Sequence, residues 1–457
     1  MTTLLNELWW LLVLIGVMIL VHELGHFWAA RFFKIKVDVF SFGFGPRLFG
    51  FKRGDTDYRF SLFLFGGYVK MVGDQPGDAH AADPDGFLAK PRWQRLIVLA
   101  AGPFMNVVLA VAVLTGLYTV SYEKIIDDNS VVGHVVANSP AAKAGIQVGD
   151  RIVKIDGQVN PDWEAILTRE IASVGNPMDV TVERGKKTFE TTVTPVLDDK
   201  TGVGDAGWEG QNTIMVGEVT PGMPADRAGL QKGDVLVRVN GIAIHSGYTL
   251  PDIIRRSDGK PVIVEYWRAG FPAGTTRTVS MLPEYKAMDG KQQHWMIGVA
   301  PQVKWNIQKT SLSLPAAFTE SVRQNAKFGT LIVEMLRGIV ERRVPAKNLS
   351  GPIGIASQAT EAAKEGPSAF LTLMSMVSLN LAILNLLPIP ILDGAHILTL
   401  LVEMVMGRDI SLNVKESMLK VGFVFLMMLM VFVIYNDIAR QMAPGLILKT
   451  PVSTLRR

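Results

Sequence analysis

The sequence predicts an α-helical multi-pass membrane protein with four transmembrane helices and a large polar α+β insert. Three observations support this fold class. Apolar residues make up 48% of the 457 residues while charged residues still make up 19%, a balance typical of membrane spans joined to ordinary polar domains. Four long apolar stretches interrupt the chain, and the polar segment between the second and the third contains an internal repeat.

The apolar stretches cover approximately residues 8–30, 96–120, 370–387 and 421–435. Crossing the hydrocarbon core takes roughly 20 helical residues, so the first two stretches are long enough alone and the last two are extended by their flanks. The first stretch lacks a basic leader and a small-residue cleavage site, so we expect a retained helix rather than a signal peptide. The expected order is transmembrane helices at 1–30, 95–120, 369–394 and 418–437, a loop at 31–94, an insert at 121–368, a short loop at 395–417 and a tail at 438–457.

Charge predicts the orientation. Lys and Arg are concentrated between the first two spans, and none precedes the first span. Because cytoplasmic loops are enriched in Lys and Arg, we expect the 31–94 loop in the cytoplasm and the 121–368 insert outside. The basic C-terminal tail runs against this rule, but four spans place it outside. The net charge of +4, without a basic stripe, excludes nucleic acid as a partner, and the absence of cysteine excludes disulfides and thiolate chemistry.

The insert contains two copies of one sequence pattern. Residues 139–157 recur at 223–241, so matched positions are 223 − 139 = 84 residues apart. Each copy predicts a short helix, a Gly-Asp turn, an alternating strand and a hairpin turn of Asp-Gly or Asn-Gly. The copies resemble PDZ domains of the bacterial type, which we place at 121–205 and 206–287. PDZ folds bind an extended chain at a sheet edge, so a peptide or protein ligand is one alternative here, and a spacer or steric gate without a ligand is the other.

Two further segments are expected to lie against the membrane or a neighbouring domain. The 40–72 region is rich in Gly and aromatic residues, and the alternation over residues 58–65 predicts a β-hairpin or a small sheet. An exposed strand edge cannot face lipid, but it can line a protein cavity, where it would hold an unfolded substrate segment. Within the 288–368 region, residues 314–344 are amphipathic and predict a helix that lies along the membrane surface or packs on the repeat pair.

The strongest chemical signal is the motif His22-Glu23-Leu24-Gly25-His26. His22 and His26 project from one helix face and can hold one zinc ion, while Glu23 can act as general base on a water molecule. Such residues are costly inside an apolar helix and normally mark a functional site; the alternative is a pair of histidines that hydrogen-bond between helices. At 1.5 Å per residue, His22 lies roughly 20 Å from Trp9, inside the bilayer and nearer its cytoplasmic face.

A catalytic zinc site with two histidines needs a third protein ligand. The third apolar stretch runs into the sequence Asn385-Leu-Leu-Pro-Ile-Pro-Ile-Leu-Asp-Gly394, where Pro388 and Pro390 must break the helix. Irregular backbone at membrane depth is acceptable where it lines a site, so Asp393 is the predicted third ligand. The alternative for Asp393 is a helix-ending Asp-Gly turn at the membrane interface.

Several neighbours of Asp393 are also polar. His396, one turn further on, is either a competing ligand or a residue behind the ligands or at the interface. Asn385 would hydrogen-bond the substrate backbone or an oxyanion, and its alternative is a hydrogen bond between helices. Glu403 and Glu416 are expected to be solvated in the inner loop.

Three motifs in this order resemble the site-2 protease family of intramembrane zinc metalloproteases, the peptidase M50 type. They are the HExxH motif in the first span, Ala101-Gly-Pro-Phe-Met-Asn106 in the second, and Asn385–Gly394 in a later one. The likeness covers nearly the whole chain, and the tandem PDZ insert narrows it to bacterial members that act in an envelope stress response. One departure is Ala395, where a second glycine often follows the Leu-Asp-Gly sequence; it touches no assigned ligand.

The resemblance implies one Zn²⁺ per chain, held by the two histidines and Asp393, with Glu23 as the catalytic base. It also implies substrate handling by Asn385, to which we add Tyr68 and Asn106, and a membrane-associated β-hairpin on the cytoplasmic side in the 40–72 region.

The function implied by the resemblance is cleavage of transmembrane segments of single-span proteins in the bacterial inner membrane. An anti-sigma factor already trimmed outside and remnant signal peptides are the expected substrates, and membrane lipid is the other expected partner. The periplasmic PDZ pair would exclude proteins with bulky outer domains. Two rivals are a membrane PDZ scaffold or chaperone with a vestigial metal site, which the complete motif disfavours, and a metal transporter, which the single polar cluster disfavours.

Overall fold

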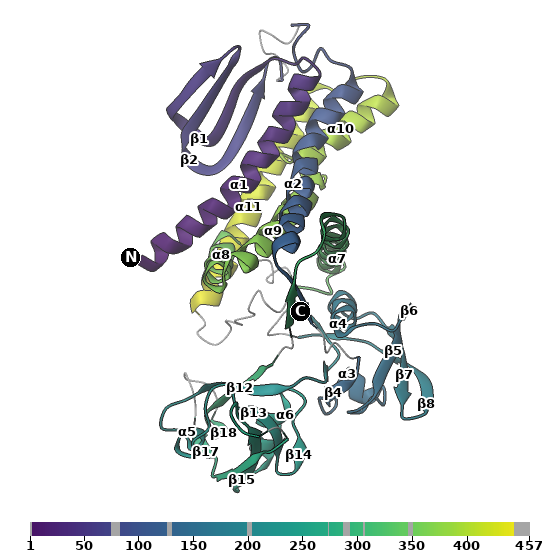
Figure 1. Ribbon diagram of the computed structural model, residues 1–457. Coiled ribbons are helices and arrows are strands. Elements are labelled where there is room, and N and C mark those ends of the chain that lie inside the picture. Colours follow the sequence, from purple (N-terminus) through teal and green to yellow (C-terminus); the bar gives the residue numbers. More distant parts are fainter. Residues whose placement is uncertain are drawn as a thin grey trace.

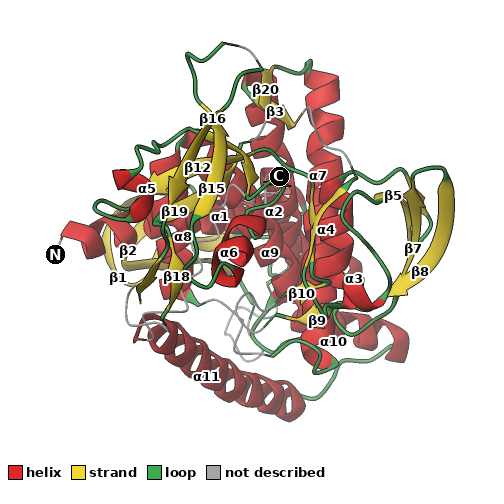
Figure 2. Cartoon of the chain, turned by 90° about the horizontal axis from the view of Figure 1, so that it is seen from below, coloured by secondary structure: helices red, strands yellow, loops and turns green. Residues whose placement is uncertain are grey.

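The computed structural model describes residues 2–74, 83–125, 130–198, 203–272, 274–286, 293–304, 307–345 and 351–442. A bundle of long helices forms its centre, with a β-sheet at one end of the bundle and two β-rich domains at the other (Figure 1). Seen along the bundle, the two β-rich domains lie beside each other (Figure 2). The predicted tail beyond residue 442 lies outside the described residues.

Four helices of the described chain are long and apolar enough to cross a membrane, which confirms the predicted number of spans. The helices are α1 (Thr2–Phe32), α2 (Arg92–Val120), α9 (Pro367–Leu386) and α11 (Leu412–Met442). Their side chains are apolar nearly all round, as expected of helices surrounded by lipid or by other helices. Leu14 and Met18 of α1 pack with Leu373 of α9, and Leu114 of α2 packs with Leu379 of α9.

The chain between the third and fourth spans differs from the prediction. The third span ends at Leu386 rather than continuing to residue 394, and the segment expected as a loop at 395–417 begins as helix α10 (Asp393–Met406). Two prolines, Pro388 and Pro390, interrupt the backbone between the helices because proline cannot donate the helical hydrogen bond. Asp393 then opens α10 in its first turn, where a negative charge is favourable.

The 40–72 region forms the predicted antiparallel pair, with strands longer than expected: β1 (Val37–Arg53) and β2 (Thr56–Met71). Both strands bend. Residues 37–42 at the start of β1 therefore pair with two parts of β2, residues 57–60 on one side and residues 67–71 on the other. Residues 67–71 therefore form one edge of the sheet. One face carries stacked aromatic rings, including Phe49 on Phe60 with ring centroids 4.7 Å apart.

The two repeats fold into separate domains with the same layout. In the first, the elements are β4 (Val132–Val135), α3 (Pro140–Lys143), β5 (Arg151–Ile155), β6 (Gln158–Val159), α4 (Trp163–Ala172), β7 (Met178–Arg184), β8 (Lys187–Val193), β9 (Val196–Leu197), β10 (Gly204–Asp205) and β11 (Trp208–Gly210). In the second, they are β12 (Ile214–Val219), α5 (Pro224–Arg227), β13 (Val235–Val239), β14 (Ile242–Ala243), α6 (Thr249–Arg256), β15 (Val262–Trp267), β16 (Arg277–Met281), β17 (Glu284–Lys286), β18 (His294–Met296) and β19 (Val299–Val303).

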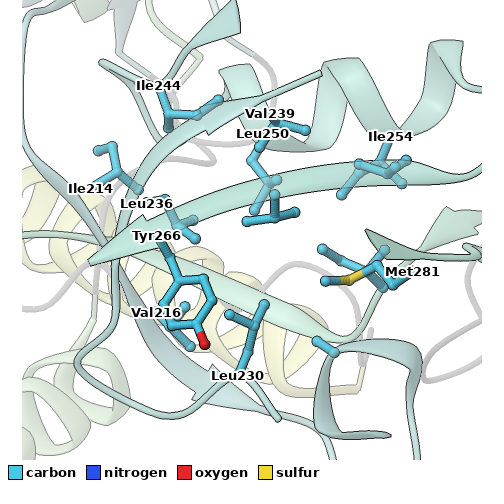
Figure 3. Close-up of a cluster of buried hydrophobic side chains, with 14 residues drawn as sticks. Ile214, Val216, Leu230, Leu236, Val239, Ile244, Leu250, Ile254, Tyr266 and Met281 are labelled. Carbon is cyan, nitrogen blue, oxygen red and sulfur yellow. The ribbon is translucent and has the colours of Figure 1, made fainter. Parts of the chain in front are cut away.

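Each repeat domain has its own apolar core, and an ion pair recurs at matched positions. In the second domain, Leu250 and Ile254 of α6 pack over the sheet that carries Leu236 (Figure 3). Buried Asp150 holds Arg184 in the first domain, and Asp234 holds Arg268 in the second, each with a Nε–Oδ1 distance of 2.6 Å. Because these pairs are also 84 residues apart (234 − 150 and 268 − 184), the repeat extends beyond the residues that define the sequence pattern.

The domain boundaries lie further along the chain than predicted. The strand that pairs with β4 is β11, beyond the predicted boundary at residue 205, and the strand that pairs with β12 is β19, beyond residue 287. Each closing strand follows the segment of clear sequence likeness, so the repeat pattern alone could not include it. The region expected as helical from residue 288 therefore begins with strands β18 and β19, and β20 (Ile307–Thr310) pairs with β3 (Tyr122–Ile125).

The predicted amphipathic segment forms helix α7 (Leu314–Val340), which is followed by α8 (Pro352–Glu365). Helix α7 packs against α2 and α9, where Phe328 lies among apolar residues of both helices and Ser321 donates to the Val111 carbonyl at 2.7 Å. It also touches the first repeat domain, because Lys327 pairs with Glu164 of α4 at 3.2 Å. Helix α7 therefore connects the first repeat domain to the membrane helices.

One buried carboxyl joins helix α4 to the segment before β11. Glu170 is 4% exposed, accepts a hydrogen bond from the Trp208 indole N–H at 2.9 Å and accepts another from the Ala206 backbone N–H. Burial raises the pKa of Glu170 from 4.5 to about 8. The carboxyl group therefore fills the space between α4 and the 204–208 segment.

We expect the first repeat domain to lose stability as pH rises from about 4.5 to about 8. In this window an unfolded Glu170 loses its proton while the folded one keeps it, so unfolding is favoured by about 1.4 kcal/mol per pH unit for this group. Hydrogen exchange of residues 163–172 in the full-length protein, corrected for intrinsic rates, should therefore be faster at pH 8 than at pH 6.

Glu170→Gln is the matched variant, because it removes the titration and replaces one accepting oxygen with a donor. It should be less stable at pH 5 and show a smaller pH dependence than the wild type. Burial also raises the pKa of Glu209 to about 7. Glu209 therefore keeps part of the pH dependence of stability in the Glu170→Gln variant. Identical pH dependence in the two proteins would contradict this account.

Candidate metal centre

Helix α1 brings two histidines together on the face that packs against α2. His22 and His26 are one turn apart and 8% and 7% exposed, and their Nε2 atoms are 3.2 Å apart. Residues four positions apart lie above one another on a helix, so this proximity follows directly from the spacing of the motif. Both rings turn the same nitrogen toward one point.

Asp393 completes the group from the start of α10. Its Oδ2 atom lies 3.2 Å from His22 Nε2, and its Oδ1 atom lies 3.6 Å from His26 Nε2. The ligand atoms of the three residues all lie within 4.8 Å of one another. Two imidazoles and one carboxylate form a ligand set typical of catalytic zinc, which leaves a fourth position for water or substrate. The residues therefore fit a zinc ion.

Helix α2 fits closely against these ligands because it carries a glycine there. A Cβ atom at Gly102 would lie 2.3 Å from His26 Nε2 and 2.8 Å from His22 Cε1. On the other helix, a Cβ atom at Gly25 would lie 2.3 Å from the Ala101 carbonyl oxygen. Small residues let membrane helices approach closely, and here the close approach places α2 directly against the two histidine rings.

Two groups of α2 reach the outward nitrogens of the histidine rings. His26 Nδ1 lies 2.8 Å from the Val98 carbonyl oxygen, and His22 Nδ1 lies 3.3 Å from the side-chain amide of Asn106. Asn106 is fully buried, so it lies behind a ligand rather than on a surface open to substrate.

Glu23 lies beside the edge of the β-sheet. A Cβ atom at Gly67 would lie 3.0 Å from Glu23 Cγ, and the carboxyl group of Glu23 contacts the backbone of Val69. The edge formed by residues 67–71 therefore passes directly beside the residue that the motif assigns as a base. Tyr68, on this edge, stacks on Phe44 with ring centroids 6.0 Å apart.

The other predicted site residues lie outside the group of three. Asn385 is half-buried in the last turn of α9, and His396 is exposed on α10. Within the described part of the chain, the group of metal-ligating atoms includes neither His396 nor any further histidine or carboxylate.

Glu403 was expected to be solvated, and that expectation is wrong. It is 0% exposed, and its Oε1 atom accepts from Lys415 Nζ at 2.6 Å and from the Ile410 backbone N–H at 3.0 Å. Because Lys415 belongs to α11 and Glu403 to α10, this pair connects the helix that begins with Asp393 to the fourth span. The signal in the sequence was an acidic residue within an otherwise apolar stretch.

Sequence reasoning also missed Asp437 at the far end of α11. Its carboxylate accepts hydrogen bonds from the backbone N–H groups of Gly351, Ile353 and Gly354 at 3.0–3.1 Å. These groups open helix α8, and the free N–H groups of a helix start attract a carboxylate. Asp437 therefore anchors the end of the fourth span to α8.

A model of peptidase family M50 matches residues 10–429 of the chain. The chain belongs to peptidase family M50. It is 31% identical to the regulator of sigma-E protease RseP of Salmonella typhimurium over 460 residues, which cover 94% of the chain and 97% of that protein. The RseP of Escherichia coli is 31% identical over 465 residues, with the same coverage. A protein of Neisseria meningitidis whose name assigns it provisionally to the zinc metalloproteases is 31% identical over 463 residues, which cover 96% of the chain and 99% of that protein.

Membership of family M50 agrees with the geometry of the site. The chain is a zinc metalloprotease with membrane helices, and His22, His26 and Asp393 form a group that could hold a metal ion. Its motif residues lie inside the matched region, and its relatives are bacterial.

Proposed function

We propose that this M50 peptidase cleaves peptide bonds within the transmembrane segments of single-span membrane proteins. One observation carries the proposal: the three-residue metal group is centred on α1, a helix long and apolar enough to cross a membrane. A hydrolytic site at that depth acts on protein chain that is itself within the membrane, and water reaches it through a cavity lined by protein.

We assign one zinc ion to His22, His26 and Asp393. When bound, zinc polarises the scissile carbonyl group and lowers the pKa of a water molecule. Glu23 takes the proton of the attacking water and delivers it to the leaving nitrogen, as a general base that becomes a general acid. We keep Asn385 and Tyr68 as residues that contact the substrate, because Asn385 lies half-buried in the last turn of α9 and Tyr68 lies on the sheet edge that passes Glu23.

The sheet edge at residues 67–71 supplies a way to hold the substrate. A peptide bond in a transmembrane helix is internally hydrogen-bonded, so the helix must unwind before attack. An extended segment can add to a sheet edge as a further strand, and no strand of the described residues pairs with the outer side of this edge, which borders Glu23. Strand addition would present an unwound substrate next to the base.

We assign the two repeat domains to the PDZ class and place them in the periplasm, above a site nearer the cytoplasmic face of a bacterial inner membrane. The concentration of Lys and Arg in the 31–94 loop supports this orientation. We propose an anti-sigma factor already trimmed outside as one substrate and remnant signal peptides as another, as the resemblance to the site-2 protease family implies, and the names of two relatives refer to sigma-E regulation. The repeat pair would act as a size filter, with or without a peptide ligand.

The test compares the wild type with Glu23→Gln on a tagged single-span substrate in reconstituted bilayers, with the zinc content of both proteins measured. The variant should lose about 10²–10⁴-fold in cleavage rate and keep its zinc, since the base is removed and the ligands stay. Glu416→Gln, an exposed carboxylate on α11, is the matched control and should cleave normally.

Equal cleavage by the wild type and Glu23→Gln would overturn the assignment of the base. A zinc-loaded wild type that cleaves no transmembrane segment would overturn the proposed function and favour a membrane scaffold that keeps a vestigial metal site.

A further inference from the structure

We propose that Asn106 is a positioning residue for the metal ligand His22, and that helix α2 sets the ring tautomer of both histidine ligands. This inference rests on the proposed zinc site. It concerns the part of the Ala101–Asn106 motif that the catalytic assignments leave unexplained. A histidine that ligates zinc normally donates its other ring N–H to a protein acceptor, which fixes the tautomer and the ring orientation.

His26 already has such an acceptor. Its Nδ1 atom lies 2.8 Å from the Val98 carbonyl oxygen, and a carbonyl can only accept, so Nδ1 carries the proton. The lone pair of Nε2 is then directed toward Asp393 and His22. A backbone group on α2 therefore holds His26 in the tautomer that can bind a metal.

His22 must meet the same requirement through a side chain. Its Nε2 atom faces Asp393 Oδ2 at 3.2 Å, so ligation through Nε2 leaves the proton on Nδ1. The Asn106 amide is the polar group at Nδ1, with Nδ2 at 3.3 Å, while Asn106 Oδ1 is buried without a hydrogen-bond partner among the described residues.

Rotating the Asn106 amide by half a turn satisfies both groups. The oxygen and nitrogen of an amide have nearly the same shape, and their assignment depends on the hydrogen-bond network. After rotation, Oδ1 accepts a hydrogen bond from the Nδ1–H group of His22, so a buried acceptor and a buried donor are paired. The amide thus gives His22 the acceptor that Val98 gives His26.

The surroundings of Asn106 restrict it to this role. It is fully buried, and its backbone carbonyl accepts from Ser378 Oγ of α9 at 2.9 Å, which fixes its place between the two helices. Gly102 lies one turn before it and leaves room for both rings. The motif therefore combines a small residue at the point of contact with an amide one turn further on.

The experiment measures Zn²⁺ affinity by chelator competition in the full-length protein, together with the absorption spectrum of the Co²⁺-loaded form. Asn106→Leu removes the acceptor at similar volume and should weaken Zn²⁺ binding about 10–100-fold. Asn106→Asp keeps an acceptor and should retain the wild-type Co²⁺ spectrum. Asn325→Leu is the matched control: Asn325 is also a buried asparagine, but it bonds Ser375 and the Ser321 carbonyl, so its loss should leave Zn²⁺ affinity unchanged.

A folded Asn106→Leu protein with wild-type Zn²⁺ affinity and Co²⁺ spectrum would overturn the positioning role. If that variant does not fold, Asn106→Asp decides: an altered Co²⁺ spectrum overturns the proposal, and an unaltered one supports it. His22→Ala separates this inference from the metal site itself. If His22→Ala loses Zn²⁺ while Asn106→Leu keeps wild-type Zn²⁺ affinity, only the role of Asn106 is refuted. If His22→Ala keeps full Zn²⁺ affinity, the proposed zinc site itself is refuted.

Discussion

Asp393→Ala is expected to abolish Zn²⁺ binding and proteolysis together. Asp393 supplies the carboxylate that faces both histidines, with distances of 3.2 and 3.6 Å to their Nε2 atoms. Its loss leaves two imidazoles from a single helix, which is fewer than the three protein ligands that a catalytic zinc site requires. The loss in affinity should exceed the 10–100-fold typical of removing a group behind a ligand. Zinc content after purification and cleavage of the single-span substrate measure both effects.

His396→Ala is the matched control for Asp393→Ala. His396 belongs to the same helix, three residues further on, and was a competing candidate for the third ligand. It is exposed and lies outside the group of three, so its replacement should preserve Zn²⁺ content. The reverse pattern, with zinc kept in Asp393→Ala and lost in His396→Ala, would transfer the third ligand to His396.

The local part of the site could be predicted from the sequence because helix geometry fixes it. A spacing of four residues places His22 and His26 on one face wherever the helix lies. The long-range part needed more than geometry. Asp393 follows His26 by more than 360 residues, and only the pair of prolines and the resemblance of the motifs linked them.

The contacts of α2 with the ligands could not be predicted, because they depend on how two helices pack. The sequence shows Gly102 and Asn106 within a span, but it does not show which helix they face. The sequence therefore predicts substrate handling for Asn106, whereas the structure buries this residue against His22. Glu403 is a similar case. The sequence does not show that α11 brings Lys415 to this carboxylate, which is buried in the structure.

The fold was predictable in its spans and repeats and less so at their ends. Apolar length and internal likeness are strong signals that extend over many residues. Strand pairing is a weaker signal: β11 and β19 are three and five residues long and close their domains only through hydrogen bonds to β4 and β12. Helix α10 was not predicted because it has only 14 residues. Such a length is too short to span the membrane, so the segment was expected to be a loop.

Gly102→Ala is expected to remove Zn²⁺ binding and proteolysis without unfolding the protein. The added Cβ atom would lie 2.3 Å from His26 Nε2, well below any ordinary contact, so the ring or the whole of α2 must move. The ring cannot turn away freely because its Nδ1 atom is tied to the Val98 carbonyl. Displacing a ligand atom by even about 1 Å is enough to disable a site that depends on orientation.

Gly116→Ala on the same helix is the matched control, because a Cβ atom there meets nothing within 4 Å. Alanine is favoured over glycine inside a helix by up to about 1 kcal/mol, so this control should be slightly more stable than the wild type and equally active. The same helical gain at position 102 offsets part of the cost of the clash, so the variant should still fold while zinc and activity are lost. If Gly102→Ala kept its zinc and cleaved normally, α2 would not press on the ligands as closely as the structure has it, and the positioning role of Asn106 one turn away would lose its geometric basis.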